Sequence, residues 1–182
     1  MQSLRGKLLI ASPAIIDPNF RRAVVLLAEH TEEGAMGVVL NRVSQFAVGD
    51  AVPGLAYLGA DEAPVHVGGP VADSAVTVLA EFDDPSQAAL LIEPDLGFVP
   101  AEPEDQDAAA QAVRRLRVFA GHAGWGPGQL EAEMDEESWI VEEPRRDDVF
   151  TDEPEGLWAA LLRRKGGEFA LIATMPADPS LN

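Results

Sequence analysis

The sequence predicts a single α+β domain, because strand-type and helix-type segments are mixed along the chain and an early hairpin precedes them. The apolar run Ala23–Ala28 is followed by a short polar turn containing Gly34 and then by a second run, Ala35–Leu40, which is typical of a hairpin. Residues Glu153–Lys165 show a helical apolar stripe, with Gly166-Gly167 as its stop. A length of 182 residues suits one domain, and no repeat or long linker divides it.

The first half of the chain is expected to be mainly strands. Lys7–Ala11 forms the first strand, and a loop with the turn signal Asp17-Pro18-Asn19 leads into the hairpin. Apolar residues between 44 and 58 recur near helical spacing, so we expect a short helix and then a loop there. Pro64–Pro70 predicts a strand that runs into a Gly68-Gly69 corner, and two further strands are expected over 71–79 and 88–92.

The second half mixes helices and strands. An acidic connection is expected over 94–104, followed by a helix over 105–115 that would place Arg114 and Arg115 at its end. The apolar run 116–120 continues into a glycine-rich turn, and a helix is predicted over 127–137. The remaining expectations are a strand over 139–141, a charged loop over 145–152, a strand or packed segment over 169–173, and an irregular tail from Pro176.

The charge balance limits the classes of partner. The chain has 31 acidic residues against 13 Lys and Arg, a net charge of −18, which disfavours direct binding to nucleic acid or to an anionic membrane. It has no cysteine, so it can form neither a disulfide nor a thiolate metal site. No apolar run reaches 18 residues, and the N-terminus lacks the pattern of a signal peptide. We therefore expect a cytoplasmic protein.

No catalytic or cofactor motif is complete. A Gly-x-Ser-x-Gly elbow is missing, and the three histidines are isolated, so no metal site and no cofactor are expected. The Gly124-x-Gly126-x-Gly128 turn resembles a dinucleotide fingerprint, but Gln129 stands where that motif needs glycine. The turn is either a tight structural bend or an anion site built from backbone N–H groups. The acidic group around Asp147 and Asp148 indicates a solvated surface, with weak divalent-cation binding as the alternative.

Two residues have a structural and a functional interpretation that the sequence leaves open. Arg42, at the end of a buried strand, either pairs with Glu131 or Asp178 or clamps an anionic ligand. Trp125 is either a core plug or an exposed stacking platform.

Seven separated segments, taken together and in order, resemble the AlgH/YqgE family of bacterial proteins. They are Gly6–Pro13, Asp17–Phe20, Glu29-His30, Gly34–Arg42, Val67–Val71, Gly124–Glu131 and Asp178–Asn182. The resemblance implies one α+β domain with a bifurcated, mostly antiparallel sheet folded towards a pseudo-barrel and flanked by helices. It also implies a cytosolic protein of unsettled biochemistry. Some members are labelled transcriptional regulators, but no catalytic residues transfer.

The chain departs from the family pattern at two places, and it matches it at the residues we expect to form one surface. His122 stands where members often have an aromatic residue, and Leu79-Ala80 stands where they often have a Leu-His pair. The matching residues are Asn41, Arg42, Gly68, Gly69, Gly124, Trp125, Gln129 and Glu131.

Two functions are compatible with that surface. The first is a non-enzymatic binding module with a regulatory role, acting through a protein partner or a small ligand. The second is an enzyme acting on a small anionic substrate, with Arg42 as anion clamp, Glu131 as acid or base, and N–H groups of the turn as oxyanion donors.

Overall fold

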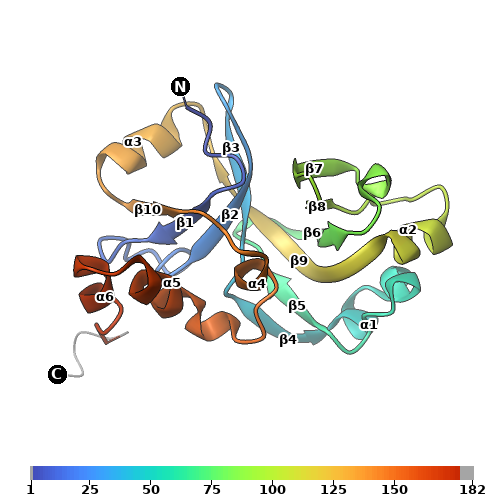
Figure 1. The fold of residues 1–182 in the computed structure, drawn as a ribbon. Helices are drawn as coiled ribbons and strands as arrows, with labels where there is room; N and C mark the ends of the chain where they lie inside the picture. The colour runs from blue at the N-terminus through green and yellow to red at the C-terminus, as the bar shows by residue number, and fades with distance from the viewer. Residues whose placement is uncertain (1, 177–182) are drawn as a thin grey trace.

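The computed structural model describes residues 2–176 and contains one ten-stranded sheet that divides into two arms (Figure 1). The strand order is β10-β1-β2-β3-β9-β6-β8-β7, and β4 joins through β5, which pairs with β9. Within residues 2–176 the β5–β9 pairing is parallel and the others are antiparallel. The predicted α+β class and mostly antiparallel sheet are confirmed, and the sheet is not a closed barrel. The strands are β1 (Leu8–Ala11), β2 (Val24–Thr31), β3 (Gly34–Val39), β4 (Val43–Ala47), β5 (Pro64–Val67), β6 (Val71–Phe82), β7 (Leu90–Glu93), β8 (Leu96–Phe98), β9 (Val113–Trp125) and β10 (Trp139–Glu142).

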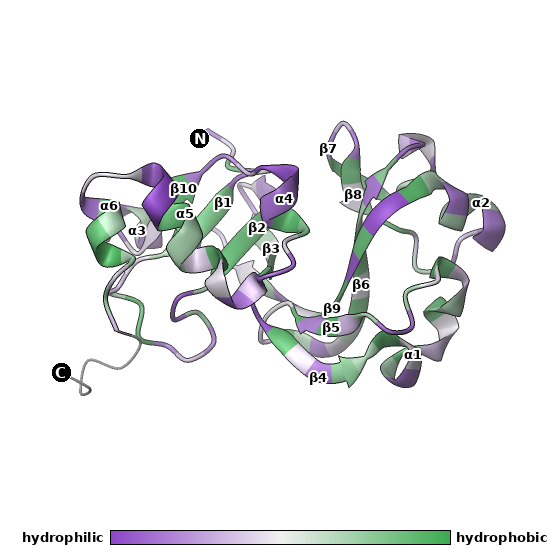
Figure 2. Cartoon of the chain, turned by 60° about the horizontal axis from the view of Figure 1, so that its bottom comes forward, coloured by the Kyte–Doolittle hydropathy of each residue, from purple (hydrophilic) through white to green (hydrophobic). Residues whose placement is uncertain are grey.

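Short helices flank the two arms. In Figure 1, α3, α5 and α6 lie beside the arm of β10, β1 and β2, whereas α1 and α2 lie at the far end of the other arm. Figure 2 shows that apolar residues are concentrated along β1, β2 and α5 in that first arm. The helices are α1 (Val48–Ala51), α2 (Gln106–Ala112), α3 (Gln129–Asp135), α4 (Arg146–Val149), α5 (Leu157–Lys165) and α6 (Glu168–Ile172), with 3₁₀ turns at Pro53–Leu58, Pro85–Gln87 and Pro154–Gly156.

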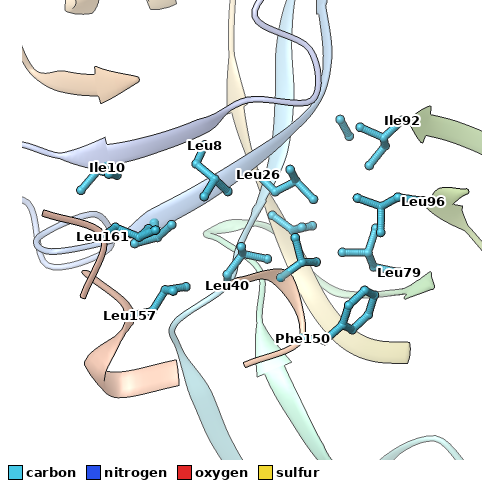
Figure 3. Packing of buried hydrophobic residues seen from close by; sticks show 14 of the residues in the cluster. Leu8, Ile10, Leu26, Leu40, Leu79, Ile92, Leu96, Phe150, Leu157 and Leu161 are labelled. Atoms are coloured by element: carbon cyan, nitrogen blue, oxygen red, sulfur yellow. The ribbon is translucent and has the colours of Figure 1, made fainter. Parts of the chain in front are cut away.

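A hydrophobic core fills the angle between the arms (Figure 3). Leu8 and Ile10 from β1 meet Leu161 from α5 on one side, while Leu79 and Leu96 close the core from β6 and β8. All five side chains are at most 1% exposed. Burying a leucine or isoleucine side chain contributes about 1.5–3 kcal/mol, so this core holds the two arms at a fixed angle.

A second core lies on the opposite face of β1, β2 and β3. Successive side chains of a strand point to opposite faces of the sheet, so every second residue of these strands packs in this core. It contains Leu9, Val25, Trp125, Leu130 and Trp139, and it fixes α3 and β10 against the sheet. This core supports one of the cavities described below.

Most predicted elements are confirmed, but residues 43–58 differ from the expected helix and loop. Val43–Ala47 is the strand β4, and the helix that follows is a single turn, α1. β4 pairs with β5, and its side chains are largely exposed. An exposed edge strand lacks the buried apolar alternation from which a strand is recognised in a sequence.

The expected helix over 105–115 is also wrong at its end. α2 stops at Ala112, and Val113 is extended (φ −94°, ψ 126°) and opens β9. Arg114 and Arg115 therefore lie on a strand, where Arg115 Nε donates to the buried Glu81 carboxylate at 2.8 Å. Cross-strand pairing of Val113 with Phe82 outweighs the local helical pattern.

Three shorter segments also differ from expectation. The connection 94–104 contains the buried strand β8, which is only three residues long and holds a glycine. The loop over 145–152 contains the one-turn helix α4, and the segment 169–173 lies largely in helix α6. Each element is too short to show a period in the sequence. The family-like segment Asp178–Asn182 lies outside the described residues.

Candidate functional site

The predicted order of strand, glycine turn and helix is confirmed, but the strand continues past the expected 116–120 to Trp125, so that Gly121 and Gly124 lie in β9 and the turn is confined to residues 126–128. β9 ends at Trp125, and α3 begins at Gln129 after a turn in which Gly128 adopts φ +72°. Gln129 Oε1 accepts a hydrogen bond from Gly126 N at 3.0 Å, so this turn N–H already has a partner. The Trp125 residue is 6% exposed, which makes it a core plug and not an exposed stacking platform, and it borders one of the cavities described below.

Glu133, one helical turn after Gln129, holds the two buried indoles of this region. Its Oε2 accepts hydrogen bonds from Trp125 Nε1 at 2.9 Å and from Trp139 Nε1 at 2.8 Å. Its Oε1 accepts one from Gln129 Nε2 at 3.0 Å. Glu133 was not among the residues expected to form the surface, and the only local signal of its role is the i, i+4 spacing from Gln129.

A cavity of about 360 Å³ lies beside these indoles. Phe20 packs against both, with its ring centroid 6.2 Å from that of Trp125 and 5.9 Å from that of Trp139. We call this space the aromatic cavity; its lining residues are Ile15, Asp17, Phe20, Gly124, Trp125, Gln129, Glu133, Ser138 and Trp139.

Glu131 pairs with His30 and not with Arg42. His30 is buried, and its Nδ1 accepts a hydrogen bond from Leu4 N at 2.9 Å, so the Nε2 proton is available to donate to Glu131 Oε1 at 2.9 Å. The hydrogen bond from the backbone N–H of Glu131, followed by the one from His30, lowers the pKa of this carboxyl. His30 lies opposite Ala35 at the start of β3, whereas Arg42 follows the end of β3. At about 3.4 Å per residue, the two groups are roughly 20 Å apart.

Asn41 is a buried structural residue that holds the preceding loop. It is 6% exposed, its Oδ1 accepts from Val24 N at 2.9 Å, and its Nδ2 donates to Arg22 O at 2.8 Å. Arg22 has φ +56°, a left-handed conformation that non-glycine residues adopt at a cost of about 1–3 kcal/mol. The two Asn41 bonds offset this strain and fix the start of β2.

Arg42 lies at the junction of β3 and β4, next to the backbone of Arg21 and Arg22. Arg42 Nη2 donates to the backbone carbonyl of Arg21, whereas the guanidinium of Arg22 stacks on the ring of Trp158 and donates to the carbonyl of Met175. Burial lowers the pKa of Arg42, and burial followed by the charge of Arg21 lowers the pKa of Arg22. Within residues 2–176, no carboxylate oxygen lies within 4.0 Å of any of the three side chains. Asp178, the other partner expected for Arg42, is outside the described residues.

A second cavity, of about 390 Å³, opens beside Arg42. We call it the arginine cavity; its lining residues are Pro18, Asn19, Val39, Arg42, Val67, Gly69, Pro70 and Asp73.

The Gly68-Gly69 corner forms the wall of this cavity, and both glycines are needed there. A Cβ on Gly69 would lie 2.2 Å from His122 C, and Gly69 has φ +150°. A Cβ on Gly68 would lie 2.3 Å from Gly121 O. Gly68 also donates to Ala120 O and accepts from Val39 N, both at 2.8 Å, so the corner ties β3 to β9.

The eight residues expected on one surface divide between two cavities and the structure beneath them. Arg42 and Gly69 line the arginine cavity, and Gly124, Trp125 and Gln129 line the aromatic cavity. The loop before β2 separates the cavities, because Asn19 lines the first whereas Asp17 and Phe20 line the second. Asn41 and Gly68 are buried supports, and Glu131 lies apart with His30.

Two further features of residues 2–176 bear on the class of site. No group of three or more His, Cys, Asp or Glu side chains there is placed to hold a metal ion. No helix in that range is long and apolar enough to cross a membrane.

Comparison with known proteins gives one consistent result. An AlgH-like family model matches residues 8–170. A UPF0301 protein of Streptomyces avermitilis is 46% identical over 188 residues, covering 100% of this chain and 97% of that protein, and one of Streptomyces coelicolor is 47% identical with the same coverage. A crystal structure of a Corynebacterium diphtheriae protein matches with a TM-score of 0.85 and 27% identity, over 96% of this chain and 94% of that one. The solution structure of the AlgH protein from Pseudomonas aeruginosa matches with a TM-score of 0.70 and 30% identity, over 97% and 98% of the two chains. The chain therefore belongs to the AlgH-like family.

Proposed function

We propose that this protein is a non-enzymatic binding module with a regulatory role, and that it recognises an anionic group of a protein partner or small ligand at the arginine cavity. The observation that carries the proposal is the Arg42 guanidinium, which lines that cavity and has no carboxylate oxygen within 4.0 Å among residues 2–176. A guanidinium with free N–H groups is suited to bidentate binding of a carboxylate or a phosphate.

The distribution of charge makes this group unusual within the protein. In a chain of net charge −18, seven of the 13 Lys and Arg side chains have a carboxylate oxygen within 4.0 Å among residues 2–176. Arg42 is one of the other six and, within the described residues, the only one of them that lines the arginine cavity. Burying a guanidinium without a carboxylate partner is costly, and burial alone lowers the pKa of Arg42. An anion bound against Arg42 would offset this cost, and it would bind at the Arg42 side of the cavity because Asp73 also lines it.

The enzyme alternative has less support. Its anion clamp and its acid or base, Arg42 and Glu131, lie at opposite ends of β3. The N–H of Gly126, which could have served as an oxyanion donor, is bonded to Gln129. Acid–base catalysis needs its groups within hydrogen-bond reach of one substrate, which this arrangement does not provide.

The proposal is tested by calorimetric titration of the full chain with three probes: inorganic phosphate, citrate and a hexaglutamate peptide. We expect at least one probe to bind saturably in low salt and to bind more weakly as salt screens the charges. Arg42→Ala should reduce that affinity by roughly tenfold or more, which corresponds to the loss of a charge-assisted hydrogen-bonded pair. A response to the peptide alone would indicate a protein partner, and a response to phosphate or citrate would indicate a small ligand.

Arg163→Ala is the matched control. Arg163 is exposed on α5, has no carboxylate within 4.0 Å in the described range, and lines neither cavity. The same change of charge there should leave the affinity within about twofold, well under 1 kcal/mol. Absence of binding to every probe, or an equal loss in both variants, would contradict the proposal. Retardation of DNA fragments that depends on Arg42 would instead indicate a nucleic-acid ligand.

A further inference from the structure

The aromatic cavity has a chemistry opposite to that of the arginine cavity. Three rings form its apolar wall: Phe20, Trp125 and Trp139. Trp139 is nearly perpendicular to both neighbours, at 81° to Phe20 and 77° to Trp125, with centroids 5.8–6.2 Å apart throughout the group. Tilted and edge-to-face packing of this kind holds the rings rigidly, and aromatic faces carry the negative part of the ring quadrupole.

The charged groups of the cavity are all acidic. Asp17 and Glu133 line it, and none of its nine lining residues is Lys, Arg or His. The three side-chain donors to Glu133, two indole N–H groups and an amide, are neutral. No cationic nitrogen in residues 2–176 lies within 4.0 Å of either carboxylate. The hydrogen bonds orient the carboxylate of Glu133 but leave its negative charge uncompensated.

We propose that the aromatic cavity binds an organic cation, an alkylammonium group, with its charge facing Glu133 and Asp17 and its alkyl groups against the rings. Ring faces and carboxylates both attract a cation, and the alkyl groups of an ammonium fit an apolar wall. A neutral apolar ligand would desolvate Glu133 without compensating its charge, and an anion would be repelled. The volume of about 360 Å³ lies within the range of small-molecule pockets.

The alkylammonium group could belong to a free amine or to a lysyl side chain of a peptide. The two sources are distinguished by the probes choline and Nα-acetyl-lysine methylamide. A third probe, 3,3-dimethyl-1-butanol, has the shape of choline with carbon in place of nitrogen and carries no charge. Two of the three tryptophans line the cavity, so intrinsic tryptophan fluorescence reports occupancy directly.

We expect a saturable change in fluorescence with choline, with the lysine derivative or with both, and no saturation with the neutral alcohol over the same range. Glu133→Gln should weaken binding by roughly tenfold, because it removes the charge and keeps the side-chain shape. Since Glu133 also holds two indoles, a second variant, Phe20→Leu, removes a ring face without touching that carboxylate, and it should weaken binding by about threefold.

Matched controls separate these effects from general changes of charge or apolar surface. Asp135→Asn neutralises an exposed carboxylate on the same helix, and Phe46→Leu replaces an exposed ring on β4. Both should leave the affinity unchanged. The proposal is overturned if neither ammonium probe saturates, if the neutral alcohol binds as tightly as choline, or if folded Phe20→Leu protein binds like the wild type.

Discussion

His66 should make the protein less stable as the pH falls below neutrality. It lies on β5, is 2% exposed, and its ring centroid is 5.5 Å from that of Phe119. Burial, followed by the charge of Arg117, lowers the pKa of His66 to about 4 from 6.5. Its Nδ1 has no hydrogen-bond partner within the described residues. The folded protein therefore keeps this ring neutral at pH values where the unfolded chain binds a proton.

The sign and size of the effect follow from proton linkage. The pKa of His66 is lower in the folded protein than in the unfolded chain. Above pH 6.5 the ring is neutral in both states and the free energy of unfolding has its full value. As the pH falls from 6.5 towards 4, the unfolded chain binds a proton that the folded protein does not bind, so the free energy of unfolding decreases. One pKa unit corresponds to about 1.4 kcal/mol, and pH 5 lies about 1.5 units below 6.5. Between pH 7 and pH 5, His66 should lower the free energy of unfolding by about 2 kcal/mol. Staying at pH 5 keeps the protein above its pI of about 4.3.

Urea unfolding of the wild type and of His66→Phe at pH 7 and pH 5 measures this contribution. The variant should lose about 2 kcal/mol less than the wild type between the two pH values, whatever its stability at pH 7. His122→Phe replaces a half-buried histidine on β9, and it tests whether the smaller loss of stability between pH 7 and pH 5 is particular to position 66. Equal losses in the wild type and in His66→Phe would refute the reasoning.

Two other predictions concern the structure beneath the cavities. Gly69→Ala should destabilise the fold by about 3 kcal/mol or more, because its Cβ meets backbone at 2.2 Å at a positive φ, whereas Gly124→Ala, with no contact closer than 3.7 Å, should have little effect in thermal unfolding. Asn41→Ala should cost about 2–3 kcal/mol in urea unfolding, because it leaves the N–H of Val24 and the carbonyl of Arg22 without their buried partner; a loss below about 0.5 kcal/mol would show that the two bonds do not hold the loop.

Local sequence patterns were sufficient to predict the β2–β3 hairpin and the helix α5. The hairpin of β2 and β3 and the helix α5 were predicted because each has an apolar run or stripe bounded by polar or glycine residues. The turn between Trp125 and α3 was predicted from its glycines and Pro127. The strands β4 and β8 were missed because one is exposed and the other has three residues.

The contact partners of individual side chains could not be predicted from local sequence patterns. Arg42 and Glu131 both match the family pattern, yet they contact Arg21 and His30 at opposite ends of β3. Glu133 was not among the residues expected to form the surface, although two tryptophans donate to it, one from the end of β9 and one from β10. These contacts join positions that are far apart in the chain or on different elements.

The sequence by itself determined the fold class, the family, the acidic charge and the glycine turn, because each depends on composition, on local periodicity or on ordered short motifs. Only the tertiary structure decided that Trp125 is a core plug, that Asn41 supports the loop before β2, and that the matching residues divide between an arginine cavity and an aromatic cavity. The physical reason is that cavities and ion pairs depend on how strands from distant parts of the chain pack, and the loop between Asp17 and Arg22 separates the two cavities only after β2, β3 and β9 have been brought together.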